Sequence, residues 1–519
     1  MGENTTQGTM HDAHVAAVQG TARKSALSRR DFVKLAAGTF AAASLAGVAG
    51  CAPKTISGSE AIAKASKTVE CDVLIVGSGA AGTTAATKAA QAGANTIVIE
   101  KMAWLSGGSS SLAIGTLYGA GTQLQKKAGI EDDPQGLYEY FLTRGGDKMD
   151  DAMQRFCAEE YGKTIDWMNV ELGIPFKDAV SVKGTDTVAR GHNINPNANV
   201  ALTAMYEQAQ KAGARYDFEM AAQSLIVEDG AVKGVLARHD AETYVAYKAK
   251  KTVMASGGFC RNSTMIDQYM PNYSGVYTEV GLGCTGEGLQ MGLDIGADYI
   301  GHGGTNGILY CSVAAGQSKL ISNKAMWINS DGVRFNNEGG QTHDIYYQVA
   351  NFKDQHFYAV YDQKMVDALN DTLKAQFDLG MKQGIFKKGE TVKEAADALG
   401  INGTAAQEQL DQYNEMAAAG KDTQFNKKES LLVPLTEGPF YVLTMGVCTH
   451  GSFGGYKVDT DFRVLDTKGN PIPNYYAAGE VACGSFIYDD YPAGGCGLNF
   501  AYTSGRFAGA NAAAAAAKA

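Results

Sequence analysis

The feature that most constrains the fold is a glycine-rich turn between a short apolar run and a segment of small residues. The run 71–76 reads Cys-Asp-Val-Leu-Ile-Val, and Gly-Ser-Gly-Ala-Ala-Gly follows at once at 77–82. Residues 83–93 predict a helix, and the apolar run 95–99 predicts a second strand that leads into Glu100. A β-turn-α-β unit of about 30 residues that ends in an acid is typical of a dinucleotide-binding domain.

Each small residue of the turn has a physical reason to be there. Gly77 permits the tight turn, Gly79 lets a pyrophosphate approach the backbone, and Gly82 lets the helix pack closely on the strand. The N-terminus of the helix then faces the phosphates, and Glu100 would accept hydrogen bonds from ribose hydroxyls. The sequence therefore predicts an α/β fold with a Rossmann-like domain.

Composition sets limits on the remaining possibilities. The chain has 519 residues, which predicts about two to four domains. Its hydrophobic content of 45% is ordinary for a globular protein and excludes a disordered or fibrous one. The net charge of −10 argues against a nucleic-acid partner. Nine cysteines are too few for a disulfide scaffold, and no C-x-x-C occurs, so neither a haem, an iron–sulfur cluster nor another metal site is predicted.

The N-terminal segment resembles an export signal. Ser28–Lys34 contains the twin arginines Arg29-Arg30, and a mildly apolar run, 35–50, follows it. A twin-arginine motif before such a run is typical of Tat export, and the run is too short to span a bilayer comfortably. Its end at Cys51 resembles a lipobox. We therefore expect an envelope lipoprotein on the outer face of the cytoplasmic membrane, whose only membrane contact is a lipid on Cys51; the alternative is a plain helical tail.

Further motifs appear in order along the chain after the glycine turn. They are SGGSS (106–110), VMASGGF (253–259), TGEGLQMGLDIGA (285–297), DGVRFNNE (331–338), SFGGYKVD (452–459), AAGEV (477–481) and SGRFAG (504–509). With them the sequence resembles the FAD-binding flavoprotein superfamily of fumarate reductases, urocanate reductases and 3-ketosteroid dehydrogenases over roughly residues 70–515. The resemblance implies FAD as the cofactor, and it is much less specific for the substrate.

The resemblance also implies which residues hold FAD. Gly77, Gly79, Ala81 and Gly82 would hold the pyrophosphate, and Glu100 the ribose. The other implied contacts run from the adenine side to the ring: Ser256 and Gly257 at the adenine-side loop, Glu480 at the ribityl chain, Ser106, Gly108 and Ser109 beside the isoalloxazine and ribityl groups, and Leu498 behind the ring. Each of them could instead be plain turn chemistry.

The domain order follows from the same resemblance. We expect a signal at 1–50, a tether at 51–67, and an FAD-binding domain made of 68–300 and 448–519. Residues 301–447 would be an inserted α+β cap. The substrate would lie between cap and flavin, because pockets commonly form at domain interfaces.

The first substrate-binding candidate is the stretch Tyr491-Pro492-Ala493-Gly494-Gly495. In the fumarate reductase branch the matching stretch carries an arginine that clamps a carboxylate, and here Pro492 stands at that place. The stretch matches the Tyr-Pro-x-x-Gly form of the 3-ketosteroid dehydrogenases. That match implies that the Tyr491 hydroxyl and the Gly495 amide bind a ketone oxygen, a pair that suits a neutral carbonyl better than a dicarboxylate. The alternative is a core tyrosine at a helix start.

The proton donor is expected after Arg334-Phe335-Asn336-Asn337-Glu338. Fumarate reductases carry an Arg-Asp there, and 3-ketosteroid dehydrogenases a tyrosine. Here His343-Asp344 stands one residue further along, and Tyr346-Tyr347 follows. Histidine titrates near working pH, so His343 is the first candidate for the proton relay, with Asp344 orienting it and the two tyrosines in reserve. A surface histidine would look the same in sequence.

Two further histidines lie at the ends of the predicted cap. His450 falls within one position of a substrate-binding histidine of fumarate reductases, and His302 lies where that branch has a polar substrate contact. The alternatives are a hinge histidine packed on the flavin domain and a surface residue.

Together these expectations favour an exported FAD-dependent reductase of a C=C bond conjugated to a carbonyl, in an enone or a related unsaturated acid or ketone. Flavin N5 would deliver hydride to the β-carbon, and a protein acid would protonate the α-carbon. Electrons would come from a separate membrane or haem partner. The alternatives are a 3-ketosteroid-type desaturase running in reverse, a fumarate reductase, and a flavin-carrying electron shuttle that would need no cap.

Overall fold

The computed structural model describes residues 55–145, 148–311, 320–340, 342–487 and 491–519. The predicted signal and Cys51 lie outside the described residues. Residues 53–519 form one unit by their mutual contacts. Among the described residues no helix combines the length and apolarity needed to cross a bilayer.

Part of the predicted tether forms a helix. Helix α3 (Gly58–Lys64) begins with a capping box, in which the Ser57 hydroxyl and the Glu60 side chain satisfy each other's backbone amides. Its Ala61 is buried against Ile226 and Leu236. Capping and burial together explain why an ordered segment precedes the first strand.

The predicted β-turn-α-β unit is present, and the α/β fold class is confirmed. It consists of β1 (Lys67–Val76), α4 (Ala80–Gln91) and β2 (Thr96–Ile99), and β1 and β2 are parallel. The sheet around them has eight strands. Its remaining members are β6 (Arg215–Asp217), β7 (Ala221–Glu228), β8 (Ala231–Arg238), β9 (Tyr244–Met254), β18 (Arg463–Leu465) and β19 (Pro471–Ala477).

The order of the sheet is β18-β19-β9-β1-β2-β6, and β7 and β8 form an antiparallel meander with β9. Strand β19, near the C-terminus, pairs in parallel with β9. The last part of the chain therefore joins the same sheet as the strand that precedes the glycine turn.

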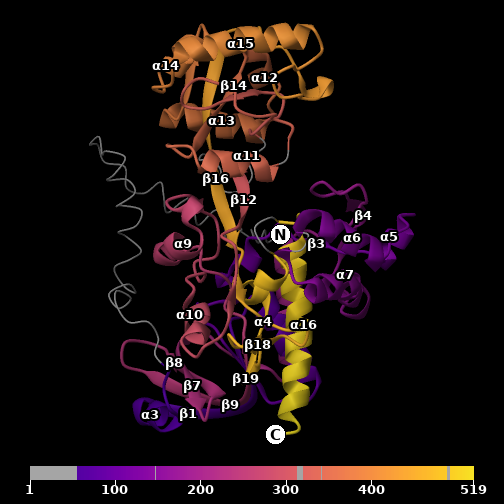
Figure 1. The fold of residues 1–519 in the computed structure, drawn as a ribbon, viewed down its shortest axis with the longest axis vertical. Coiled ribbons are helices and arrows are strands. Elements are labelled where there is room, and N and C mark those ends of the chain that lie inside the picture. The colour runs from indigo at the N-terminus through magenta and orange to yellow at the C-terminus, as the bar shows by residue number, and fades with distance from the viewer. Residues whose placement is uncertain (1–54, 146–147, 312–319, 341, 488–490) are drawn as a thin grey trace, which may run out of the picture. The chain divides into compact units, whose positions relative to one another are not determined.

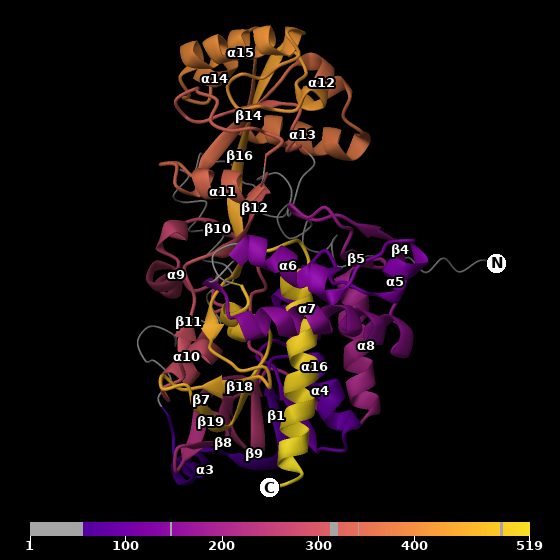
Figure 2. The same ribbon diagram turned by 45° about the vertical axis from the view of Figure 1, so that its right-hand side comes forward.

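Helix α16 (Cys496–Ala516) packs against α4, and Figures 1 and 2 both show the two helices side by side. The contact is made by small residues. A Cβ atom at Gly505 would lie 2.3 Å from the carbonyl oxygen of Ala81, and one at Gly509 would lie 2.2 Å from that of Ala85. The two helices are therefore too close to accommodate a side chain at either glycine. This close packing holds α4, and with it the glycine turn that precedes α4, in place.

A second sheet of six strands forms the cap. Its central strand β16 (Phe440–Ser452) is joined by β10 (Tyr277–Thr278), β12 (Thr305–Tyr310), β13 (Met326–Ile328), β14 (His356–Tyr361) and β15 (Phe386–Gly389). Figures 1 and 2 show the cap helices gathered around β14 and β16: α11 (Thr342–Ala350), α12 (Gln363–Asp367), α13 (Asp371–Gln383), α14 (Val392–Asp397) and α15 (Gly403–Ala418). Strand β16 runs across the predicted boundary at 447/448, and β10 comes from before residue 300.

A buried ion cluster holds the cap together. Arg334 and Glu338 of the DGVRFNNE motif bond through two contacts of 2.8 Å, and Arg334 also binds Asp422 at 2.7 Å. The Lys427 ammonium lies 3.3 Å from Glu338. All four side chains are fully buried, so each charge is compensated by its neighbours rather than by water.

A small three-stranded sheet, β3 (Thr116–Tyr118), β5 (Gly191–Ile194) and β4 (Phe176–Ser181), was not predicted. Around it lie α5 (Gln123–Lys127), α6 (Pro134–Gly145), α7 (Asp151–Asp166) and α8 (Ala198–Lys211). The remaining elements are α9 (Ser263–Tyr269), α10 (Glu287–Leu293), β11 (Tyr299–Ile300) and β17 (Gly455–Tyr456).

Candidate active site

The glycine turn has the geometry that a pyrophosphate site needs. Gly77 has φ +104°, and a Cβ atom there would lie 2.4 Å from the carbonyl oxygen of Ala255. A Cβ atom at Gly82 would lie 1.9 Å from the carbonyl oxygen of Gly77. Gly79 is the N-cap of α4 and places no side chain over the helix N-terminus. Gly79 thus leaves the first turn of α4, which includes Ala81, accessible to an anion, and the Ser110 hydroxyl accepts the Ala80 amide there at 3.0 Å.

Glu100 lies against this turn. Its carboxylate accepts hydrogen bonds from the Ser78 amide and hydroxyl, both at 2.9 Å, and from the Met102 amide at 2.9 Å. Three donors fix the acid at the end of β2, beside the turn, where the ribose was expected.

Two loops meet beside the turn on the predicted flavin side. The first loop carries two short helices, η1 (Leu105–Gly107) and η2 (Ser109–Ser111). Gly108 lies between them, and Ser109 is the first residue of η2. A Cβ atom at Gly281 would lie 2.3 Å from the carbonyl carbon of Gly108, and the Gly281 amide donates to the Ser109 hydroxyl at 3.2 Å. The side chain of Ser106 lies outside the described part of the structure.

Large apolar side chains on these loops are exposed. Leu112 is 50% exposed, Ile114 70% and Leu282 64%. Exposed apolar residues around a glycine rim fit a bound ring system that would cover them. Leu498, in the first turn of α16, is half-buried and packs against the buried cluster that contains Leu117 of β3.

Glu480 joins the cap strand to the nucleotide-binding sheet. It lies in η7 (Gly479–Ser485) after β19 and accepts the amide of Ser452 at 2.7 Å and its hydroxyl at 2.9 Å. A Cβ atom at Gly258 would lie 2.0 Å from the Glu480 carboxylate. Burial raises the pKa of Glu480, and the two Ser452 donors oppose this effect.

The adenine-side loop supplies a polar atom that needs a partner. The Ser256 hydroxyl is buried and has no hydrogen-bond partner within the described ranges, and the next residue, Gly257, has φ +74°. An orphaned hydroxyl, the glycine cradle, the fixed acid and the exposed apolar rim together fit FAD. Bound FAD would be held by the turn 77–82, Glu100 and the loops at 106–109 and 256–258.

Tyr491 and Gly495 lie together at the start of α16. The Tyr491 hydroxyl oxygen accepts the amide of Gly497 at 2.8 Å, and Gly495 is the N-cap of the helix, with φ +109°. The Tyr491 ring stacks on Phe453, with ring centres 5.5 Å apart. Burial raises the pKa of Tyr491, and the amides of Gly497 and Gly495 oppose this by less. The phenol therefore keeps its proton at neutral pH and can donate it in a hydrogen bond.

The cap histidines differ in their surroundings. His450, near the end of β16, is half-buried, and its Nδ1 has no partner among the residues that the structure describes. Burial lowers the pKa of His450, so the ring is neutral at working pH. His302, between β11 and β12, is exposed. Phe453, three residues after His450, makes the contact with Tyr491.

The expected proton donors lie on α11. His343 and Asp344 are in its first turn, and their side chains lie outside the described part. Tyr346 is buried, its hydroxyl donates to the carbonyl of Thr305 at 2.6 Å, and its ring covers Gly307. A hydroxyl fixed in this way anchors α11 to β12, and we do not carry Tyr346 forward as a proton donor. Tyr347 is 44% exposed.

The structure brings one segment to the site that the sequence analysis missed, the turn 183–186 after β4. A Cβ atom at Gly184 would lie 3.4 Å from the carbonyl oxygen of Pro492, and one at Gly494 would lie 3.8 Å from Cδ of Lys183. The same Pro492 carbonyl accepts the Tyr140 hydroxyl at 2.6 Å. These contacts join positions more than 300 residues apart in sequence, and no local motif announces them.

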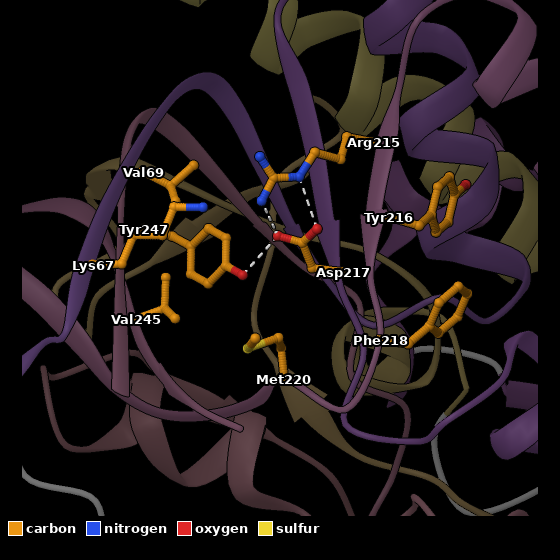
Figure 3. Close-up of a pocket in the computed structure, with 9 residues that line it drawn as sticks. All are labelled: Lys67, Val69, Arg215, Tyr216, Asp217, Phe218, Met220, Val245 and Tyr247. Atoms are coloured by element: carbon orange, nitrogen blue, oxygen red, sulfur yellow. Dashed lines mark hydrogen bonds and ion pairs between the residues drawn. The ribbon is translucent and has the colours of Figure 1, made fainter. Parts of the chain in front are cut away.

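A separate cavity of about 340 Å³ lies elsewhere on the large sheet (Figure 3). Its walls include Lys67 and Tyr247, in the N-terminal halves of β1 and β9, whereas the glycine turn follows the C-terminal end of β1. Arg215 and Tyr247 converge on Asp217, at 2.8 and 2.7 Å, and occupy its carboxylate. In the cavity wall the Asp217 carboxylate is therefore satisfied, whereas the buried hydroxyl of Tyr216 has no hydrogen-bond partner among the described residues.

Comparison with known proteins agrees with this geometry. The sequence matches the FAD binding domain family over residues 72–498. Urocanate reductase from Eggerthella lenta is 30% identical over 467 residues, which cover 86% of this chain and 75% of that protein. A flavocytochrome c3 fumarate reductase structure has a TM-score of 0.74 at 27% identity and covers 88% of this chain and 80% of its own.

A third comparison shows the fold alone. The structure of 3-ketosteroid-Δ4-(5α)-dehydrogenase from Rhodococcus jostii has a TM-score of 0.73 at 24% identity and covers 89% of this chain and 99% of its own. The expected family, cofactor and enzyme class are confirmed. The chain belongs to the FAD binding domain family and is an FAD-dependent oxidoreductase.

Proposed function

We propose that the protein reduces a C=C bond conjugated to a carbonyl group, and that the Tyr491 hydroxyl binds the carbonyl oxygen. The observation that carries the proposal is the placement of Tyr491. Its oxygen already accepts the amide of Gly497 at 2.8 Å, so its proton remains for an external acceptor. The amide donor polarises the O–H bond and strengthens the hydrogen bond that Tyr491 can give.

Each residue has a distinct task in this proposal. Bound FAD supplies the hydride for the β-carbon. Tyr491 stabilises the negative charge that develops on the carbonyl oxygen during transfer, while the amides of Gly497 and Gly495 hold the Tyr491 oxygen in place. Phe453 covers the Tyr491 ring and limits the access of water to it. His343 remains our candidate for protonating the α-carbon, and His450 and His302 our candidates for substrate contact.

The direction of the reaction is part of the proposal. The relatives that support reduction are named for reductases, urocanate reductase and fumarate reductase. A Tyr-Pro-x-x-Gly stretch is shared by resemblance with 3-ketosteroid dehydrogenases, so desaturation of a ketone is the second candidate. Both directions use the same oxygen contact, because hydride transfer is reversible.

The test is an anaerobic screen of the flavin-loaded protein. The dye-reduced enzyme is mixed with neutral enones, unsaturated monocarboxylates, urocanate and the dicarboxylate fumarate, and reoxidation of the dye is followed. We expect turnover with compounds that carry one activating carbonyl. Preference for fumarate over all others would contradict the proposal, and so would a chain that is folded but colourless. Desaturation is tested by running saturated ketones with an oxidising dye.

We also propose that the protein works outside the cytoplasm as a lipoprotein. The twin-arginine motif at Arg29-Arg30 and the cysteine at Cys51 support this location. Nicotinamide cofactors are scarce there, so a separate membrane or haem protein would supply the electrons.

A further inference from the structure

Lys183 lies against the loop that holds the proposed carbonyl site. Its stem crosses Gly191 of β5, where a Cβ atom would lie 2.8 Å from Cγ and Cε of the lysine. It continues to Gly494, whose Cβ position is 3.8 Å from Cδ of Lys183. Two glycines therefore make room for this side chain and direct it toward the residue next to Gly495.

The turn that carries Lys183 is held by several contacts. The carbonyl oxygen of Lys183 accepts the amide of Asp186 at 3.2 Å, and Gly184 touches Pro492. The Asp186 carboxylate also accepts the buried Tyr118 hydroxyl and pairs with Arg190 at 2.9 Å.

The charge of Lys183 is not compensated by the protein. Asp186, the nearest acid along the chain, shares Arg190 with Asp132 and makes no ion pair with Lys183, and no other ion pair of Lys183 occurs within the described ranges. A second cation, Arg144, reaches the same turn, where it donates to the Thr185 hydroxyl at 3.3 Å. Lys183 as a residue is half-buried, and an anionic partner would compensate its charge.

The N-terminus of α16 adds to the positive potential. The N-cap Gly495 has no side chain to cap the helix, which is 21 residues long. The positive end of the helix dipole and the Lys183 ammonium thus flank the loop from Tyr491 to Gly495. An anionic ligand at this loop would gain from both.

We propose that Lys183 determines specificity by pairing with an anionic group of the substrate, namely a carboxylate conjugated to the C=C bond. One carboxylate oxygen would accept a hydrogen bond from the Tyr491 hydroxyl, and the other would form an ion pair with the Lys183 ammonium. The substrate class is then an α,β-unsaturated monocarboxylate, and the product is the saturated acid. This inference rests on the proposed function, because it takes Tyr491 as the oxygen-binding residue.

The pairing also has a chemical purpose. A carboxylate already carries a negative charge and resists the further charge that hydride transfer adds to its oxygens. A cation at that end offsets the developing charge in the transition state. Lys183 should therefore affect turnover of the acid as well as its binding.

The experiment compares matched acids and ketones on the flavin-loaded full chain. Cinnamate is paired with its methyl ketone, 4-phenylbut-3-en-2-one, and crotonate with pent-3-en-2-one. We expect Lys183→Met to lower kcat/KM for the acids roughly 10- to 100-fold, the usual loss for a charge-assisted hydrogen bond. The ketones should change by no more than about twofold, because they never pair with the ammonium. Lys183→Arg should retain most of the acid activity.

A control variant and a binding readout separate this role from a structural one. Lys177→Met removes an exposed charge from β4, the strand that precedes the turn, and should leave both classes of substrate unchanged. The dissociation constant of 3-phenylpropanoate, measured from the change in flavin absorbance, should rise in Lys183→Met without any turnover.

The outcomes are distinct. Equal losses with acids and ketones, or no loss with either, would overturn the role of Lys183. Wild-type protein that reduces the ketones but neither reduces nor binds the acids would overturn the substrate class and leave the proposed function standing. Absence of turnover with every pair would refute the proposed function itself.

Discussion

At the scale of single residues, the chemistry depends on how Tyr491 is held. Its ring is fixed by Phe453 and its oxygen by the amide of Gly497, so the hydroxyl proton has one free direction. A donor that is fixed before substrate arrives does not have to be reorganised in the transition state. Tyr491 therefore contributes to the reaction through its O–H group, and its ring positions that group.

The first prediction concerns that hydroxyl. Tyr491→Phe keeps the stacked ring and removes the donor, so we expect kcat to fall by about 10²-fold or more while FAD stays bound. Single-turnover reoxidation of the reduced flavin by a substrate measures the hydride step directly. The FAD content after gel filtration is the control. Kinetics equal to those of the wild type would remove Tyr491 from the reaction.

A second residue-scale prediction concerns the pH dependence of stability. His192 of β5 is fully buried, with Nε2 2.8 Å from the Thr122 hydroxyl and Nδ1 2.8 Å from the carbonyl of Arg190. Burial lowers the pKa of His192 from 6.5 to about 4. Between these values the unfolded chain binds more protons than the folded one, so the free energy of unfolding decreases as the pH falls, by at most roughly 3 kcal/mol.

Urea unfolding across this pH interval measures the effect. His192→Gln keeps a polar side chain without the titration, so its stability should fall less steeply as the pH decreases than that of the wild type. Parallel pH profiles for the two proteins would show that His192 does not titrate differently on folding.

At the scale of elements, the closest helix contact controls the cofactor site. The carbonyl of Ala81, in the first turn of α4, lies 2.3 Å from where Gly505 of α16 would carry a Cβ atom. We expect Gly505→Val to push α4 away, to cost about 1–3 kcal/mol of stability, and to weaken FAD binding. The ratio of flavin to protein absorbance after gel filtration and the thermal midpoint report the two effects.

Ala514→Val is the matched control, because it places the same side chain on the exposed face of the same helix. It should retain FAD and lose little stability. If Gly505→Val retained as much flavin as this control, the α4–α16 contact would not be what fixes the pyrophosphate turn.

The sequence predicted those elements whose structure is set by nearby residues. The turn 77–82 and its flanking strands follow from glycine sterics and apolar runs, and the pairing of Tyr491 with Gly495 follows from their short spacing. The placement of Lys183 beside Gly494 could not be predicted, because it depends on three unpredicted strands folding against α16. The sequence of the predicted tether also contains the Ser57–Glu60 capping box of helix α3, a local signal that favours a helix over a flexible segment.

The cap shows a motif with two interpretations. DGVRFNNE supported the family resemblance and served to locate the proton donor. In the fold its Arg334 and Glu338 form a buried ion cluster with Asp422 and Lys427, which fixes the segment leading to α11. The motif thus positions the helix that carries His343, and sequence spacing alone does not distinguish such a structural role from a catalytic one.

At the scale of the whole molecule, one strand connects the two chemical halves of the site. The end of β16 reaches Glu480 through Ser452, and Phe453, directly after the strand, reaches Tyr491. The predicted boundary at 447/448 falls inside this strand, whose ladder with β12 extends to Ser452. One strand of the cap sheet therefore leads to residues that contact both the flavin-side acid and the carbonyl-binding tyrosine.

The last prediction concerns where the enzyme receives its electrons. If Cys51 carries a lipid, the wild-type chain should enter the detergent phase on phase partitioning, and Cys51→Ser should remain in the aqueous phase with its FAD and dye-linked activity intact.

Replacing Arg29 and Arg30 together by lysine should retain the folded, flavin-loaded protein in the cytoplasm, because the Tat route depends on the arginine pair. An exported Cys51→Ser protein that still reduces substrate with dyes but loses activity with membranes would show that the anchor serves electron supply. A wild-type chain found only in the aqueous phase would contradict the lipid anchor.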